Sequence, residues 1–372
     1  MNTPPVSLPS RRSFLASLAL GAAGLALGRR EAAADDPATP TVPGGQLGVA
    51  LVGLGGYATN QLAPALAQSK HCRLAGIVTG TPEKAARWQR EHQLPDRSVY
   101  DYATMDRLAE NPDIDVVYVV TPPGLHAEHT IRAAKAGKHV ICEKPMAVSL
   151  RECDAMLAAC RAAGVHLAIG YRLQFEPHWR EVQRLARDRV FGEFRTMSGG
   201  FGFHHRGGGW RLDKRLAGGG PLMDVGIYVV QAVCMAGNGA PVAVTASEPP
   251  KNRPDVFREV EETIDFRLEF ANGAQAEGTA SYELGLNRFR AEAANGFFEM
   301  EPAFSYSGLV GRTSRGPLPP STAHQQAAQL DAIAMAIRAG EPSVASGEMG
   351  RRDLGIITAI YEAARTGRRV SI

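Results

Sequence analysis

The chain has 372 residues, of which 44% are hydrophobic and 21% charged; this is long enough for two folded domains and typical of a globular protein. Its formal net charge of +3 comes from residues 1–34, which hold four arginines and one glutamate, so the remainder is close to neutral and does not indicate nucleic acid or a membrane surface as a partner. The five cysteines include no Cys-x-x-Cys pair, so their spacing indicates neither a disulfide framework nor a metal site.

The chain opens with the features of an export signal. Ser10-Arg11-Arg12-Ser13-Phe14-Leu15 begins an apolar run over residues 14–27 that is short for a membrane span, and three alanines follow at residues 32–34. Paired arginines before Ser-Phe-Leu are typical of the twin-arginine route, which carries folded cargo. We therefore expect residues 1–34 to be a signal peptide recognised by the twin-arginine machinery and removed in the periplasm, with a retained membrane anchor as the alternative. Residues 35–46 are rich in Pro, Gly and Thr, and we expect a flexible arm there.

Residues 47–170 alternate apolar strands with helices. Strands are expected at residues 47–52, 74–78, 115–120, 139–142 and 166–170, and helices at residues 58–68, 82–92, 125–136 and 150–163. Strands that are apolar throughout and separated by helices form a parallel sheet that is covered on both faces. The pattern predicts an α/β fold with a doubly wound, dinucleotide-binding (Rossmann) domain over residues 47–170.

A glycine-rich loop follows the first expected strand, where such a domain binds its dinucleotide. It reads Gly53-Leu54-Gly55-Gly56-Tyr57-Ala58. Gly53 allows the tight turn, Gly55 lets the backbone approach a pyrophosphate, and Ala58 allows close packing of helix on strand. The N-terminus of the next helix then faces the phosphates. In this context the loop indicates dinucleotide binding rather than a chance glycine turn.

The end of the second strand favours NADP over NAD. NAD-binding domains usually carry a carboxylate at this point to hold the ribose 2′-hydroxyl, but here the strand is followed by Thr79 and Thr81. Both threonines can hydrogen-bond a 2′-phosphate, and Lys84 in the next helix can neutralise it. Two alternatives stay open: Glu83 is compatible with NAD, and Lys84 is equally explained as a solvated helix residue.

Two further segments carry side chains suited to catalysis. Glu143 and Lys144 follow the strand at residues 139–142, and ligands of open parallel sheets bind beyond the carboxyl ends of the strands. Asp224 and Tyr228 are four residues apart on a helix expected over residues 222–235, so they share a face. Oxidation of an alcohol by hydride loss needs a base; a tyrosine beside a lysine can serve, and Asp224 can orient either of them. The alternatives are a surface ion pair of Glu143 with Lys144, and a structural hydrogen-bonding pair of Asp224 with Tyr228.

Together these segments resemble the Gfo/Idh/MocA family of oxidoreductases, and within it the glucose–fructose and aldose–aldose oxidoreductase subgroup. The resemblance covers essentially the whole chain, with motifs in compatible order: the export signal, GLGGYA, LHAEHTIRAAKAGKHVICEKPMAVSL, IGYR, WRL, LAGGGPLMDVGIY and IYEAARTGR. It implies that Lys144 and Tyr228 are catalytic, with Asp224 in support. It also implies that the cofactor is contacted by Gly53, Leu54, Gly55, Gly56, Tyr57, Thr79, Lys84, Tyr100, Thr121, His126, Glu143, Lys144, Arg172, Trp210 and Arg211.

The resemblance further implies a second domain over residues 171–372. It should be an α+β domain with an open, mainly antiparallel sheet that serves as a dimer interface in relatives, and its C-terminal helices should pack back on the first domain. Asn272-Gly273 and Asn295-Gly296 are hairpin turn signals that agree with such a sheet. The stretch before Trp210 departs from the subgroup, so the substrate preference does not transfer. His204 and His205 in that stretch are adjacent and lack a partner at metal-ligand spacing, which favours a structural or substrate-contact role.

The expected function follows from the export signal and the resemblance together. In the subgroup NADP stays bound while one sugar, an aldose, is oxidised to an aldonolactone and a second sugar, an aldose or a ketose, is reduced to an alditol. Such an enzyme needs no soluble cofactor pool and can work in the periplasm. The alternatives are an NAD(P)-dependent aldose dehydrogenase with exchangeable cofactor, a redox-type NAD-dependent glycosidase, and a non-catalytic sensor of sugars or nucleotides.

Overall fold

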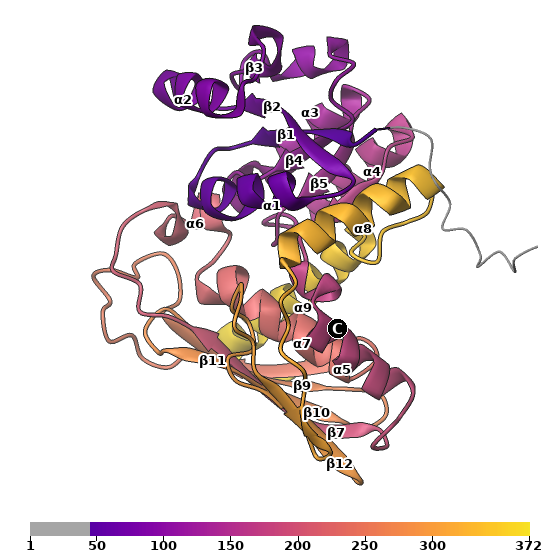
Figure 1. Cartoon of the computed structure of the whole chain (residues 1–372). Helices are drawn as coiled ribbons and strands as arrows, with labels where there is room; N and C mark the ends of the chain where they lie inside the picture. Colours follow the sequence, from indigo (N-terminus) through magenta and orange to yellow (C-terminus); the bar gives the residue numbers. More distant parts are fainter. Residues whose placement is uncertain (1–44) are drawn as a thin grey trace, which may run out of the picture. The chain divides into compact units, whose positions relative to one another are not determined.

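The first half of the described chain forms a six-stranded parallel sheet in the order β3-β2-β1-β4-β5-β6 (Figure 1). The computed structural model describes residues 45–372, so the expected signal peptide and all but the last two residues of the expected arm lie outside the described residues. The strands are β1 (Leu47–Val52), β2 (Cys72–Val78), β3 (Val99–Tyr100), β4 (Val116–Val119), β5 (His139–Cys142) and β6 (Leu167–Ile169). The helices between them are η1 (Ala58–Leu62), α1 (Ala63–Gln68), α2 (Pro82–His92), η2 (Asp96–Ser98), η3 (Met105–Glu110), η4 (Pro123–Leu125), α3 (His126–Lys135) and α4 (Leu150–Ala163).

The five strands and four helices predicted in this half are confirmed to within two residues. The strands are buried on both faces, which explains their unbroken apolar runs. The short helices η2 and η3 and two further features are absent from the prediction. Strand β3 is only two residues long, too short for a periodic signal, and the helix after the glycine-rich loop begins as a π-helical segment, η1.

The second half is built on a nine-stranded sheet in the order β14-β13-β12-β11-β7-β10-β9-β8-β15, as the resemblance implies. Strands β7 and β10 pair parallel, and the other neighbours pair antiparallel. Both predicted hairpins are confirmed: Asn272-Gly273 joins β9 to β10, and Asn295-Gly296 joins β11 to β12. The strands are β7 (Phe194–Gly202), β8 (Ala243–Ser247), β9 (Thr263–Glu269), β10 (Gln275–Ser281), β11 (Leu286–Ala293), β12 (Gly296–Met300), β13 (Gly311–Thr313), β14 (Gly316–Pro317) and β15 (Val370–Ser371).

Helices of the second half cover one face of this sheet and reach the first half. Helix α7 packs on β7, α8 lies against α1, and α9 lies against α4 and β6 (Figure 1). Helix α9 therefore contacts strands of both sheets, β6 in the first and β8 in the second, whereas α8 contacts β2 in the first. The helices are η5 (Arg172–Phe175), α5 (Pro177–Arg187), η6 (Trp210–Leu212), α6 (Lys214–Ala217), η7 (Leu222–Gly226), α7 (Ile227–Ala236), α8 (Gln325–Ala339) and α9 (Gly347–Thr366).

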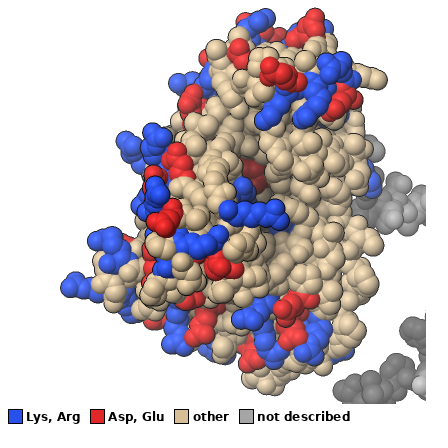
Figure 2. Space-filling model, turned by 90° about the vertical axis from the view of Figure 1, so that its left-hand side faces the viewer, with Lys and Arg blue, Asp and Glu red and all other residues tan. Residues whose placement is uncertain are grey.

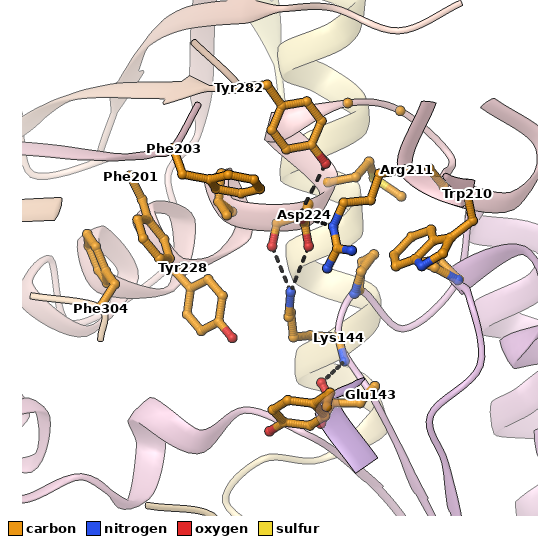
Figure 3. Close-up of a pocket in the computed structure, with 18 of the residues that line it drawn as sticks. Glu143, Lys144, Phe201, Phe203, Trp210, Arg211, Asp224, Tyr228, Tyr282 and Phe304 are labelled. Carbon is orange, nitrogen blue, oxygen red and sulfur yellow. Dashed lines mark hydrogen bonds and ion pairs between the residues drawn. The ribbon is translucent and has the colours of Figure 1, made fainter. Parts of the chain in front are cut away.

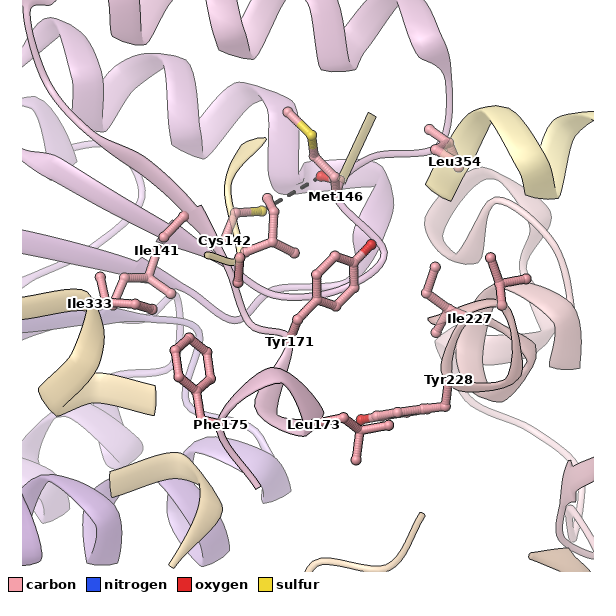
Figure 4. Close-up of a cluster of buried hydrophobic side chains, with 14 of the residues drawn as sticks. Ile141, Cys142, Met146, Tyr171, Leu173, Phe175, Ile227, Tyr228, Ile333 and Leu354 are labelled. Atoms are coloured by element: carbon pink, nitrogen blue, oxygen red, sulfur yellow. Dashed lines mark hydrogen bonds between the residues drawn. The ribbon is translucent and has the colours of Figure 1, made fainter. Parts of the chain in front are cut away.

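One buried core runs from the parallel sheet to helix α7. Figure 4 shows side chains of β5, of the segment that leaves β6, and of α7, α8 and α9 gathered in one cluster, among them Ile141, Tyr171, Leu173, Ile227, Ile333 and Leu354. The stretch Lys214–Ala236 is long and apolar enough to cross a membrane, but 94% of its most apolar window is buried inside the protein. It is therefore the central helix of this core. The core also fixes the start of α7 close to the carboxyl edge of the parallel sheet.

Candidate active site

A cavity of about 440 Å³ opens at the carboxyl edge of the parallel sheet. Its walls come from loops after β1, β4 and β5 and from α7 and the second sheet (Figure 3). Figure 2 shows a face of the molecule with a hollow at mid-height, where basic side chains stand at the edge and an acidic one lies at the back. The predicted site residues that line the cavity are Tyr57, Thr121, His126, Glu143, Lys144, Arg172, Trp210, Arg211, Asp224 and Tyr228.

Lys144 and Asp224 join the two sides of this cavity. The Lys144 ammonium donates to the backbone oxygen of Asp224 at 2.7 Å and lies 3.4 Å from its Oδ1. Lys144 follows β5 of the parallel sheet, whereas Asp224 lies in η7, eighty residues later. The side chains of both are more than 85% buried. Of the two partners that the sequence left open for Asp224, the structure places Lys144 in contact with it.

The Asp224 carboxylate is held by two further groups. Arg211 donates from Nε to Oδ2 at 2.7 Å, and the Tyr282 hydroxyl donates to the same oxygen at 3.1 Å. Burial alone would raise the pKa of Asp224, but Lys144, Arg211 and these hydrogen bonds outweigh it and lower the pKa to about 2. The carboxylate is therefore ionised at any neutral pH, and it fixes two cations at the edge of the cavity.

Tyr228 lies beside the same lysine but does not bond to Asp224. Its ring centroid is 4.9 Å from the Lys144 Nζ, and its hydroxyl accepts a hydrogen bond from Nε of Arg172 at 3.3 Å. Within residues 45–372, no hydrogen bond joins Asp224 to Tyr228, so the two are not the structural pair that their spacing also allowed. Both residues line the cavity, but Asp224 binds Lys144, Arg211 and Tyr282. Tyr228 instead accepts a hydrogen bond from Arg172.

The segment that carries Asp224 is anchored by a buried glutamate. Glu261 accepts hydrogen bonds from the backbone N–H groups of Gly220 at 2.9 Å and Leu222 at 3.0 Å, and from the Tyr361 hydroxyl at 2.8 Å. A helix start leaves N–H groups without intrahelical acceptors, and Glu261 satisfies two of them. Burial raises the pKa of Glu261, an effect that these three donors oppose. The carboxylate thus fixes where η7 and its Asp224 begin.

Glu143 is a buried support of the Lys144 loop and not half of a surface ion pair. It is 8% exposed, and its Oε1 accepts from the Tyr118 hydroxyl at 2.7 Å. Its Oε2 accepts from the backbone N–H of Lys144 at 3.1 Å. Burial raises the pKa of Glu143, with Lys144 and the Tyr118 hydrogen bond acting against that effect. The surface-pair alternative for Glu143 and Lys144 is therefore wrong.

The glycine-rich loop has the geometry that a dinucleotide needs. Gly53 has φ +97°, and a Cβ there would lie 3.0–3.1 Å from Thr121, so only glycine fits. No protein atom lies within 4 Å of a Cβ built on Gly55, which leaves space for a ligand to meet the backbone. Helical structure begins at Gly56 within this loop and continues into the π-helical segment η1, where the Thr59 N–H donates to the Gly55 oxygen at 3.0 Å, so a helix N-terminus lies at the loop. Leu54 is buried in the core, whereas Gly56 is exposed and Tyr57 lines the cavity.

Thr79 and Lys84 lie where the prediction for a 2′-phosphate needs them. Thr79 directly follows β2, is 6% exposed, and accepts a hydrogen bond from the Thr81 N–H at 3.3 Å. Lys84 is exposed in the first turn of α2. No carboxylate occupies the position of Thr79, so the residues present fit NADP at this strand end.

Two residues that the resemblance assigns to the cofactor also hydrogen-bond to other parts of the protein. Tyr100 is 6% exposed, lies outside the cavity lining, and its hydroxyl accepts from Asn111 at 3.0 Å. The ring nitrogens of His126 lie 2.7 Å from the Thr121 oxygen and 2.9 Å from the Pro145 oxygen, so His126 ties together the loops after β4 and β5. Burial lowers the pKa of His126 to about 4. Because His126 also lines the cavity and Tyr100 does not, the cofactor contact stays a prediction for both, with more support at His126.

Several residues that contribute to the site are absent from the sequence prediction. Tyr282 follows β10, Glu261 precedes β9, and Phe203 and Tyr306 line the cavity from loops of the second half. No spacing links these residues to Asp224 in the sequence, because the second sheet brings them together. His204 pairs with Glu283 at 3.3 Å, and within residues 45–372 no group of three potential metal ligands is found.

Comparison with known proteins defines the family. Residues 47–171 match the oxidoreductase family with an NAD-binding Rossmann fold, GFO_IDH_MocA, and residues 179–295 match the GFO/IDH/MocA C-terminal domain. The chain belongs to the Gfo/Idh/MocA family. A solved structure of the family, aldose-aldose oxidoreductase from Caulobacter crescentus complexed with glycerol, is 43% identical, with a TM-score of 0.86 over 88% of this chain and 100% of that one.

More distant relatives have the same Gfo/Idh/MocA architecture. D-xylose 1-dehydrogenase (NADP(+)) 2 from Haloferax volcanii is 28% identical over 334 residues, covering 87% of this chain and 98% of that protein. Levoglucosan dehydrogenase in complex with NADH and levoglucosan is 23% identical, with a TM-score of 0.76 over 88% of this chain and 99% of that one, and shares the fold. The chain is therefore an oxidoreductase with an NAD-binding Rossmann domain.

Proposed function

We propose that this oxidoreductase keeps NADP bound and transfers hydride between two sugars, oxidising an aldose to an aldonolactone and reducing a second sugar to an alditol. The observation that carries the proposal is the set of Lys144, Asp224 and Tyr228 around one cavity at the carboxyl edge of the sheet. The 43% identity to an aldose-aldose oxidoreductase over that protein's full length supports the choice of substrates.

Residues of the first half would hold the cofactor. The backbone of the glycine-rich loop would meet the pyrophosphate, and Thr79, Thr81 and Lys84 would meet the 2′-phosphate. Bound there, the nicotinamide supplies the acceptor and donor of hydride. Tyr57 of this loop and Thr121 after β4 line the same cavity as Lys144, which supports a contact of both with the cofactor.

Tyr228 would move the proton. In the oxidising half, the C1–H bond breaks with its electron pair leaving as hydride, and the deprotonated Tyr228 oxygen takes the proton of the anomeric hydroxyl, so that C1=O forms. In the reducing half, an open-chain carbonyl carbon gains the hydride and Tyr228 returns the proton to its oxygen. Lys144, held by Asp224, stabilises negative charge on the reacting oxygen.

The expected export fits this cycle. A protein that crosses the membrane folded can carry its nucleotide, and a cycle that restores the nucleotide needs no external supply. We therefore propose that the protein acts in the periplasm and that residues 1–34 are its twin-arginine signal.

The decisive experiment is an absorbance spectrum of purified, exhaustively desalted protein before and after one aldose is added. A reduced-nicotinamide band that rises without added cofactor supports a captive NADP. The band should then fall when the second sugar is added. The absence of any band with a panel of aldoses, together with the absence of bound nucleotide, would contradict the proposal.

An aldose dehydrogenase with exchangeable NADP is the second candidate, because the D-xylose 1-dehydrogenase of Haloferax volcanii is similar over 98% of its length. The same experiment separates the two. Activity that appears only when NADP is supplied favours the dehydrogenase.

A further inference from the structure

Arg172 is a buried cation beside the cavity with neutral partners. It is 2% exposed. It donates from Nη1 to the backbone oxygen of Ser305 at 3.1 Å and to the side-chain oxygen of Gln325, and from Nη2 to the backbone oxygen of Phe304. Across residues 45–372, no carboxylate forms an ion pair or hydrogen bond with it. A guanidinium stays charged, and a buried charge without a counter-charge is costly.

The Nε donor of Arg172 faces Tyr228. Its Nε is 3.3 Å from the Tyr228 oxygen, and its Cζ is 4.6 Å from the centroid of that ring. The ring of Tyr306 lies equally close, with its centroid 4.6 Å from Cζ. The guanidinium is therefore fixed by two aromatic rings and three carbonyl oxygens. Four of its five N–H groups are used in these contacts, one on Nη2 is not, and Arg172 lines the cavity, so the cofactor contact that the resemblance implies stays a prediction.

The other charged groups near Tyr228 are bound mainly to other partners, although the buried Glu143 carboxylate is near enough for Arg172 to lower its pKa. Lys144 lies over the Tyr228 ring but is paired with Asp224. Glu143 is bound to the Tyr118 hydroxyl and the Lys144 N–H. The remaining titratable groups that face this centre from other elements are Tyr57 and Tyr306. Within residues 45–372, Arg172 is thus the cation near Tyr228 that forms no hydrogen bond or ion pair with a carboxylate.

We propose that Arg172 is a positioning residue for Tyr228. It holds the phenol oxygen in place and supplies the counter-charge for the deprotonated form that accepts the substrate proton. This inference rests on the proposed function, in which Tyr228 moves that proton. Arg172 itself neither gains nor loses a proton in the cycle.

The first test needs neither substrate nor cofactor. The near-ultraviolet tyrosinate absorbance is followed against pH in the full-length protein, and the curve of the Tyr228→Phe variant is subtracted to isolate Tyr228. In Arg172→Gln, the pH at which half of this signal appears should rise by about one unit or more, and in Arg172→Lys by less, because the charge remains. An unchanged signal in Arg172→Gln overturns the inference, whatever the enzyme's substrates prove to be.

Gln325→Ala is the matched control for a purely structural role. It removes a neutral partner of Arg172, and its own hydrogen bonds to Ser305 and Tyr306, but leaves the charge beside Tyr228. Its melting temperature should fall while the tyrosinate signal stays within a few tenths of a pH unit of the parent. If Gln325→Ala reproduces the shift of Arg172→Gln, the role is structural and the inference is wrong.

A double-mutant cycle supplies the kinetic test. Arg172→Gln should slow single-turnover nucleotide reduction by about tenfold or more in the parent, and should have almost no further effect in Tyr228→Phe, because residues that act as a unit are not additive. Equal losses in both backgrounds overturn the inference. If the parent itself reduces no nucleotide with any aldose, the proposed function fails, and the tyrosinate titration alone decides the role of Arg172.

Discussion

The Lys144 ammonium donates to the backbone oxygen of Asp224 at 2.7 Å, a shorter contact than the 3.4 Å to its carboxylate. The position of the lysine therefore depends on the backbone of η7, which supplies the carbonyl acceptor, as well as on the charge of the carboxylate. Since Lys144 belongs to the edge of one sheet and η7 to the layer on the other, this contact links the two halves at the point where chemistry is proposed.

Tyr228→Phe removes the hydroxyl group that is proposed to carry the proton and keeps the aromatic ring. Both half-reactions should slow by about 10²- to 10⁴-fold, because a positioned acid or base contributes about that much. The nucleotide content of the purified variant should match the parent. Stopped-flow absorbance measures each half separately, and turnover close to the parent rate would remove Tyr228 from the mechanism.

Asp224→Asn should change stability in a pH-dependent way. The pKa of Asp224 is about 2 in the folded protein, below its ordinary value of 3.8, so its stabilising effect is complete above about pH 4 and is lost as the pH falls toward 2. The variant should lose about 3 kcal/mol of unfolding free energy at pH 7, the lower end for a broken buried pair, because Arg211 is partly exposed. Denaturant unfolding at several pH values measures this difference, which should shrink below pH 4. A difference that stays constant with pH would contradict the assignment.

Glu261→Ala should disturb the site indirectly, because it removes the anchor at the start of η7. It leaves the N–H groups of Gly220 and Leu222 without their acceptor, which costs about 1–3 kcal/mol for each buried donor. The melting temperature and kcat should fall together, since η7 carries Asp224. Tyr361→Phe is the control, because it removes only one donor to Glu261 and should cost about 1 kcal/mol. A variant with parental kcat would show that the anchor does not influence Asp224.

Gly55→Ala and Gly53→Ala should separate binding from folding. A Cβ at Gly55 meets no protein atom within 4 Å, so the melting temperature of the nucleotide-free protein should not change, while NADP affinity should fall by about tenfold or more. Gly53→Ala should also cost about 1–3 kcal/mol of stability, because φ there is +97°. Calorimetric titration with NADP and thermal unfolding measure the two effects. Unchanged affinity in Gly55→Ala would mean that the cofactor does not pass this loop.

Lys84→Ala tests the choice between the two nucleotides. The side chain is exposed, so stability should be unaffected. Loss of a charge-assisted contact to the 2′-phosphate should weaken NADP binding by about tenfold and leave NAD binding unchanged. Binding of both nucleotides to the nucleotide-free protein provides the comparison. Equal weakening of both would assign Lys84 no role at the 2′-position.

The sequence predicts secondary structure and site residues where the signal lies in neighbouring residues. Buried parallel strands such as β1 and β5 are continuous apolar runs, and Asn-Gly pairs mark the hairpins, so both could be read from neighbouring residues. Lys144, Asp224 and Tyr228 were found because each lies in a motif. Tyr282 and Glu261 could not be found this way, since only the folded sheet brings them to η7. The π-helical starts η1 and η7 have no spacing signal that distinguishes them from α-helix.

The walls of the cavity come from both halves of the chain, and this has a consequence for assembly. A partly folded protein would present the glycine-rich loop without Tyr228, Arg211 or the loop of Tyr306 to close over a nucleotide. If the nucleotide is retained as proposed, its retention would report completed folding, because a ligand bound to the whole site stabilises only the state in which both sheets are joined. For a protein proposed to leave the cytoplasm folded, loading and folding would be verified in a single step before export.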